Sequence, residues 1–179
     1  PLLPLQILFL NLVTDVFPAL ALGVGEGDPE IEKRRPRPAD EPILAALHWT
    51  EIIVFGLLIA AGGIAMLLTS HNYLQYPSEQ TVTLSFITLA LAQLWTVFLM
   101  RSYKTGWFIN DITRNKYVWM SLGVSLGMVA LVLFVPFLRD ILSLTALQPA
   151  QYLTAFLFSL APPTVGSLLK SLKSRRADN

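Results

Sequence analysis

The stretch PLQILFLNLVTDVFPALALG, from Pro4 to Gly23, is apolar except at a few positions near its middle. A helix needs about 20 mostly apolar residues to cross the hydrocarbon core of a membrane, and this stretch meets that requirement. Its only charged residue is Asp15, which is also the only acid deep within any apolar segment of the chain. A carboxylate in hydrocarbon is costly, so such a residue usually faces a bundle interior. The stretch therefore predicts a membrane helix with a functional polar position.

Four more apolar segments follow this one. In hydrocarbon every backbone polar group needs an internal partner, so all five segments should be helices. Apolar and polar residues alternate only weakly in these segments, which gives no support for a membrane barrel, whose strands are about 10 residues long. We therefore predict an all-α fold over residues 1–179, a polytopic membrane bundle of five transmembrane helices with a cytoplasmic loop at 23–42. The predicted spans are about 2–22, 43–68, 82–100, 118–138 and 147–169.

The composition supports a membrane protein. Hydrophobic residues make up 54% of the chain and charged residues 14%, against about 25% charged in soluble domains. A net charge of +1 argues against nucleic acid as a partner. The absence of cysteine excludes a disulfide framework, a zinc cluster and thiol catalysis. The start, Pro-Leu-Leu-Pro, lacks the features of a signal peptide, and we expect it to be a cut through a longer protein.

The basic residues predict an orientation. Lys and Arg concentrate in cytoplasmic segments, and with five spans three basic regions fall on one side of the membrane. Of the 13 Lys and Arg residues, only Arg139 falls on the other side. The N-terminus should therefore lie outside and the C-terminus in the cytoplasm. The three regions comprise Lys33, Arg34, Arg35 and Arg37; Arg101, Lys104, Arg114 and Lys116; and Lys170, Lys173, Arg175 and Arg176.

The polar residues of the first span are candidate cation ligands. In an α-helix the spacing of Asn11, Thr14 and Asp15 puts them on one face. Oxygens of carboxylates, amides and carbonyls are what hard cations prefer. Pro18 has no N–H, so the carbonyl of Thr14 loses its helical donor and the helix should be partly unwound near Asp15. The alternative is a protonated Asp15 hydrogen-bonded between helices, with Pro18 as an ordinary kink.

Gln93 is the main polar residue of the third span and a fourth candidate ligand. It could complete the same site, or it could simply hold two helices together at about 1 kcal/mol.

Two sets of glycines predict close helix packing. Gly123 and Gly127 form a small-xxx-small pattern that suits contact within the chain or with a partner, and Gly56, Gly62 and Gly63 are interpreted in the same way.

Nothing in the sequence predicts catalysis by this chain alone. It contains no phosphate-binding glycine loop, no readable nucleophile and base, and no pair of intramembrane carboxylates. We therefore predict no catalytic and no cofactor-binding residue.

The run Asn-Leu-Val-Thr-Asp, with a proline three residues after the aspartate, resembles the sixth transmembrane helix of P-type cation pumps of the sarcoplasmic-reticulum calcium ATPase type and their prokaryotic relatives. The prolines and charges at 28–42 resemble the cytoplasmic loop that follows this helix, and 147–169 resembles the tenth helix. The resemblance covers the whole chain and is most specific before residue 45.

The resemblance implies a set of ligands. It makes Asn11, Thr14 and Asp15 cation ligands, with Asp15 bridging two ions where two bind. Gln93 stands where two-site calcium pumps have Glu on the eighth helix, which puts a second ion in doubt. Val16 stands where those pumps often have Gly, so Pro18 would have to do more of the local unwinding.

The resemblance also implies which functions belong to this chain and which to other domains of the pump. The chain would be the cation-binding membrane module of an ATP-driven pump, in a prokaryotic plasma membrane, with lipid and the remaining pump domains as its partners. The transported ion would be calcium, with manganese and sodium as alternatives. ATP and magnesium would act only through domains absent from this chain, so the chain alone should be inactive as an enzyme. The competing hypotheses are a non-enzymatic scaffold or partner-binding bundle and, more weakly, a secondary-transporter fragment, although no internal repeat supports the latter.

Overall fold

The fold was analysed in a computed structural model that describes residues 2–24, 46–100 and 111–177. All regular elements in these ranges are helical, and five helices are long and apolar enough to cross a membrane. The predicted all-α membrane bundle of five helices is therefore confirmed. The predicted loop at 23–42 lies almost entirely outside the described residues.

The first span consists of three consecutive helical pieces. They are the α-helix α1 (Pro4–Leu10), the π-helix η1 (Asn11–Val16) and the α-helix α2 (Phe17–Gly23). The predicted unwinding near Asp15 thus takes the form of a wider helix, not a break in it.

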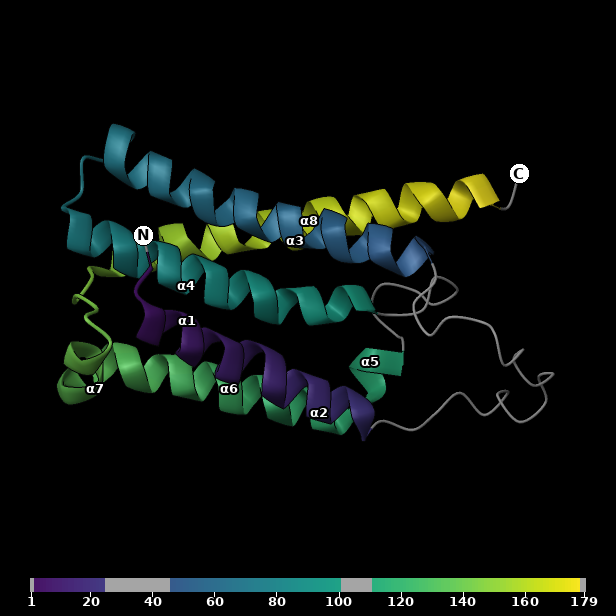
Figure 1. Cartoon of the computed structure of the whole chain (residues 1–179), viewed down its shortest axis with the longest axis horizontal. Helices are drawn as coiled ribbons and strands as arrows, with labels where there is room; N and C mark the ends of the chain where they lie inside the picture. The colour runs from purple at the N-terminus through teal and green to yellow at the C-terminus, as the bar shows by residue number, and fades with distance from the viewer. Residues whose placement is uncertain (1, 25–45, 101–110, 178–179) are drawn as a thin grey trace.

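The other four spans follow in alternating directions (Figure 1). The second is α3 (Ala46–Leu68), which continues into the π-helix η3 (Thr69–Tyr73). The third is α4 (Ser78–Thr96), which ends in the 3₁₀-helix η4 (Val97–Met100). The short α5 (Asp111–Arg114) leads into α6 (Lys116–Phe134), and α7 (Pro136–Ile141) leads to α8 (Pro149–Ala177).

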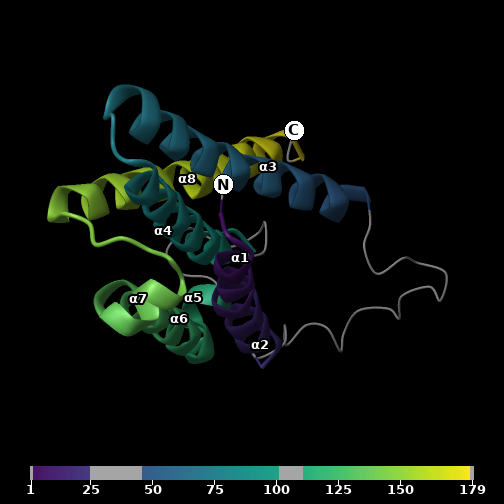
Figure 2. The same cartoon turned by 60° about the vertical axis from the view of Figure 1, so that its left-hand side comes forward.

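Helix α4 is the centre of the bundle. It packs against α3 and α8 on one side and contacts η1 and α6 on the other, and it is the most buried of the five spans. The first span packs along α6, so α1, α2 and α6 form one group and α3, α4 and α8 another (Figure 2). Buried apolar residues of both groups meet in one core, which includes Val13, Phe86 and Val129.

Close packing of glycines occurs between α3, α4 and α8. A Cβ added at Gly62 would lie 2.8 Å from Cγ of Pro162, and one at Gly63 would lie 2.7 Å from Cδ2 of Leu89. By contrast, a Cβ at Gly56, Gly123 or Gly127 would meet no atom of the described chain within 4 Å, so the prediction fails for Gly56. Close packing is confirmed for the first pair, whereas the small-xxx-small pattern on α6 makes no such contact among the described residues.

Candidate cation site

The π-helix η1 changes which carbonyl Pro18 leaves unpaired. In an α-helix the N–H of residue 18 would serve the carbonyl of Thr14, but in a π-helix the carbonyl of residue i pairs with the N–H of residue i+5. The carbonyl that faces the missing N–H of Pro18 is then that of Val13. Ser125 of α6 donates its hydroxyl to this carbonyl at 2.6 Å. The Val13 carbonyl is thus satisfied from another helix. A free Thr14 carbonyl stays a prediction.

Oxygen atoms from two spans converge on the hydroxyl of Thr14. Its Oγ1 lies 2.8 Å from the carbonyl oxygen of Leu10, 3.2 Å from Oδ1 of Asp15 and 3.1 Å from Oε1 of Gln93. Thr14 is only 4% exposed, so the cluster sits at the inner face of the first span against α4.

The hydroxyl of Thr14 has one proton but lies within hydrogen-bonding distance of three oxygen atoms. A hydroxyl has one proton and can donate it to one acceptor at a time. The shortest of the three contacts is to Leu10, which leaves the carboxylate and amide oxygens of Asp15 and Gln93 beside an oxygen that is not donating to them. Oxygens so grouped are the ligand type that hard cations prefer, and a cation between them would be stabilised by all of them.

The four candidate ligands do not share one environment. Thr14 is buried and Gln93 is half-buried, but Asn11 and Asp15 are exposed on the surface of the chain. A π-helix has more residues per turn than an α-helix, so a spacing of three no longer aligns Asn11 with Thr14. The structure brings Thr14, Asp15 and Gln93 together. Within the described part of the chain the side chain of Asn11 is not hydrogen-bonded to any of them, and the predicted common face is not observed.

Two groups that take part in this arrangement were not predicted from the sequence. The carbonyl of Leu10 is a backbone group, and no side-chain pattern could have indicated it. Ser125 could have been suspected as one of two serines, with Ser121, in an otherwise apolar run.

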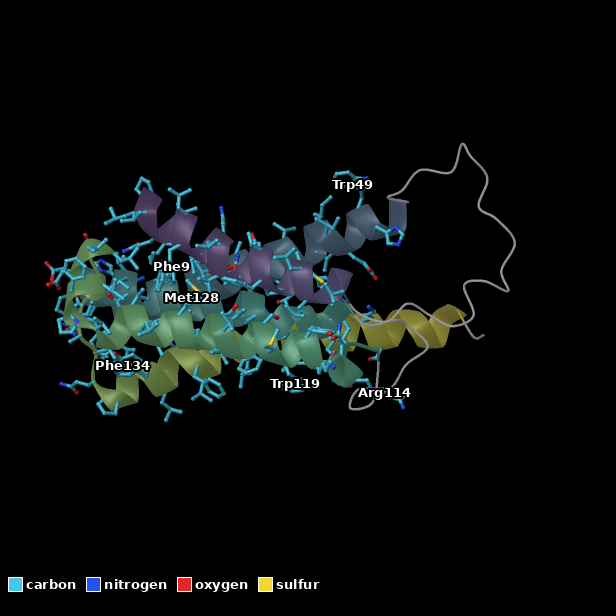
Figure 3. The ribbon with its side chains drawn as sticks, turned by 90° about the horizontal axis from the view of Figure 1, so that it is seen from below. Phe9, Trp49, Arg114, Trp119, Met128 and Phe134 are labelled. Carbon is cyan, nitrogen blue, oxygen red and sulfur yellow. The ribbon has the colours of Figure 1, made fainter. Side chains whose placement is uncertain are left out.

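A separate apolar hollow lies away from the candidate ion site. It is an apolar groove of about 420 Å³ between α1, α6 and α7, and Phe9 and Met128 face each other across it (Figure 3). Its lining offers no oxygen-bearing side chain, so it cannot coordinate a cation. The lining residues are Leu5, Leu8, Phe9, Leu12, Met128, Leu131, Val132, Leu138, Ile141 and Leu142.

The site is also incomplete as a metal centre. In residues 2–24, 46–100 and 111–177, no three His, Cys, Asp or Glu side chains come together. One carboxylate, one amide and one hydroxyl are fewer than the six to eight oxygens typical of bound calcium.

Comparison with known proteins identifies the fold's family. Residues 1–172 match the family model described as "Cation transporting ATPase, C-terminus". The chain belongs to this family. This match confirms the resemblance to cation pumps, which was most specific in the first span.

Relatives of this C-terminal region include bacterial calcium pumps. Calcium-transporting ATPase 1 of Lactococcus lactis is 33% identical over 174 residues, which is 97% of this chain and 19% of the relative. The calcium-transporting ATPase of Bacillus subtilis is 32% identical over 175 residues, which is 97% of this chain and 20% of the relative. The chain thus spans about a fifth of the length of these relatives.

Proposed function

We propose that this chain supplies one wall of the cation site of an ATP-driven calcium pump. The observation that carries the proposal is the approach of Oδ1 of Asp15 and Oε1 of Gln93 to within 3.2 and 3.1 Å of Oγ1 of Thr14. This arrangement adds polar contacts to the apolar packing of the first span against α4. Asn11, one residue along from the Leu10 carbonyl, is the fourth ligand.

The exposure of Asn11 and Asp15 fits a site shared with other helices. A lone carboxylate on a lipid-facing surface would be costly, so the surface that carries Asp15 should be covered in the complete pump. The remaining transmembrane helices of the pump would supply the missing oxygens from that side. Together with Thr14 and Gln93 they would complete the coordination shell of calcium.

The charge of the site favours a single ion. Two divalent cations need several negative ligands, and this wall provides only the carboxylate of Asp15. Gln93 contributes a neutral amide. The proposed stoichiometry is therefore one calcium per transport cycle.

The proposed orientation places the basic residues in the cytoplasm. One end of the bundle, opposite the N-terminus, holds the C-terminal part of α8 and four other helix ends (Figure 1). These helix ends are at Gly23, Ala46, Met100 and Asp111. Since cytoplasmic segments are rich in Lys and Arg, this end is proposed to be cytoplasmic, and Pro4 would lie outside. The membrane is proposed to be a prokaryotic plasma membrane, with lipid around the exposed apolar side chains.

ATP hydrolysis would occur elsewhere in the pump. The chain carries the site whose affinity changes, and the other pump domains would bind ATP and magnesium and drive that change. Calcium stimulation of ATP hydrolysis would therefore require the residues of this wall. The scaffold alternative is disfavoured by the membership in a transport family.

The proposal is tested by Asp15→Asn in the full-length pump, with calcium-dependent ATP hydrolysis and vesicle uptake as readouts. Loss of calcium activation is expected because the only carboxylate of this wall is removed. The matched control is Asp140→Asn, an exposed acid of α7 outside the cluster, which should behave like the parent pump. Unchanged calcium dependence in Asp15→Asn would remove Asp15 from the site. Repeating the titration with manganese and sodium identifies the preferred ion.

A further inference from the structure

Ser125 makes an unusual hydrogen bond for a serine in a helix of this chain. Helical Ser and Thr hydroxyls commonly bond to carbonyls of their own helix, as Ser121 does to Val118 and Ser70 does to Met66, at 2.9 and 2.8 Å. Ser125 instead donates to the carbonyl of Val13, which is 112 residues away on the first span. The distance of 2.6 Å is short for a hydroxyl donor, and both residues are fully buried.

The recipient carbonyl is one that the first span cannot satisfy by itself. Val13 lies within η1, where the donor for its carbonyl would be the N–H of residue 18. Residue 18 is proline and has no N–H. In hydrocarbon an unpaired carbonyl is costly, so the π-helical form of this turn depends on a donor from outside the helix.

This dependence links Ser125 to the ligands. Val13 directly precedes Thr14 and Asp15, and the π-helix sets how far each turns towards α4. We infer that Ser125 is a positioning residue of the cation site: its hydroxyl holds the Val13 carbonyl and thereby keeps η1 in the π-helical form that brings Thr14 and Asp15 to Gln93. The inference rests on the proposed function, because it assigns to Ser125 a role in that same site.

The first experiment compares Ser125→Ala with Ser121→Ala in the full-length pump. Both serines are buried on α6, one turn apart, but only Ser125 bonds to the first span. We expect Ser125→Ala to raise the calcium concentration for half-maximal ATP hydrolysis about three- to tenfold, the range expected for loss of an interhelical hydrogen bond to a buried acceptor. Ser121→Ala should leave it unchanged. The maximal rate of ATP hydrolysis at saturating calcium should fall by a smaller factor than the calcium affinity.

The second experiment restores the missing donor within the first span. Pro18→Ala returns an N–H to residue 18, so the Val13 carbonyl gains a helical partner and no longer needs Ser125. Adding Ser125→Ala to Pro18→Ala should then change calcium affinity by much less than it does in the parent pump. Ser125→Thr retains a hydroxyl and should preserve most of the affinity.

The outcomes separate this inference from the proposed function. If Asp15→Asn abolishes calcium activation but Ser125→Ala and Ser121→Ala behave alike, the positioning role is wrong and the site stands. If Asp15→Asn has no effect, the proposed function itself is wrong. If Ser125→Ala does not fold, its folding in the Pro18→Ala background supports the inference, and failure to fold there as well contradicts it.

Discussion

The hydroxyl oxygen of Thr14 lies 3.1 Å from the amide oxygen of Gln93, although the two residues are 79 positions apart in the sequence. This contact joins the π-helical turn of the first span to α4, the most buried helix of the bundle. It gives the proposed ion site one side that is firmly packed, because α4 is held by α3 and α8 as well. The exposed side, with Asn11 and Asp15, has no such support within the described chain.

Gln93→Ala should weaken calcium binding by the full-length pump. The change removes one oxygen of the cluster and the partner of Thr14, and we expect the half-saturating calcium concentration to rise about three- to tenfold, as for loss of a buried hydrogen-bonding partner. The measurement is equilibrium binding of radioactive calcium. The control is Gln80→Ala, on the same helix, where the amide oxygen accepts from Nε2 of Gln151 at 2.8 Å away from the site. Equal effects of both changes would contradict the ligand role.

Gln93→Glu tests the stoichiometry. A second carboxylate beside Asp15 adds the charge that another divalent cation requires. We expect more calcium bound per phosphorylated pump than the single ion proposed for the parent. If the ratio of bound calcium to phosphoenzyme stays the same, Gln93 does not limit the number of ions.

The number of spans could be predicted from the sequence because a bilayer imposes a simple requirement. A long apolar run is needed to cross the hydrocarbon, and the backbone must then be helical. Asp15 could be proposed as a site residue on similar grounds, because a carboxylate among apolar residues needs a function or a partner. These inferences use only local composition.

The geometry of the site could not be predicted in this way. The π-helix turns Asn11 away from Thr14, and the Val13 carbonyl within it accepts a hydrogen bond from Ser125, which is distant in sequence. The glycines show the same limit. Gly63 and Gly127 are alike as sequence signals, but only Gly63 has a neighbour, Leu89, close to its missing Cβ.

Asn115 has two separable structural roles at the start of α6. Its Oδ1 caps the helix by accepting from the N–H of Tyr117 at 2.9 Å, and its Nδ2 donates to the carbonyl of Ala21 at 3.0 Å. Asn115→Ala should cost about 1 kcal/mol for the cap and about 0.6 kcal/mol for the bond between helices. Asn115→Asp keeps the cap and should lose only the second.

The measurement is the midpoint of thermal unfolding of the pump in detergent, where the order parent, Asn115→Asp, Asn115→Ala is expected. Ser171→Ala is the control, because this exposed hydroxyl bonds only within its own helix, to Leu168 at 2.8 Å. An Asn115→Asp variant as unstable as Asn115→Ala would assign the whole effect to the contact with the first span.

Gly166→Ala should destabilise the bundle, whereas Gly127→Ala should not. A Cβ at Gly166 would lie 2.9 Å from Cδ1 of Leu99 and 3.1 Å from Cε1 of Phe55, so these side chains or α8 itself would have to shift. Overpacking costs about 1–3 kcal/mol, which outweighs or cancels the gain of about 1 kcal/mol in helix propensity. At Gly127 only the gain in helix propensity applies, because an added Cβ would meet no atom of the described chain within 4 Å. Unfolding midpoints that rise equally in both variants would contradict the packing.

The proposed orientation can be tested with single cysteines, because the chain contains none of its own. Tyr73 is 82% exposed at the end of η3, and Arg114 is exposed at the end of α5, at the opposite end of the bundle. In intact cells Tyr73→Cys should react with a membrane-impermeant maleimide and Arg114→Cys should not. After the cells are opened, both should react. Labelling of Arg114→Cys alone in intact cells would invert the orientation, because basic residues would then lie on the outer side. Labelling of both in intact cells would mean that the five-span arrangement is not the membrane topology.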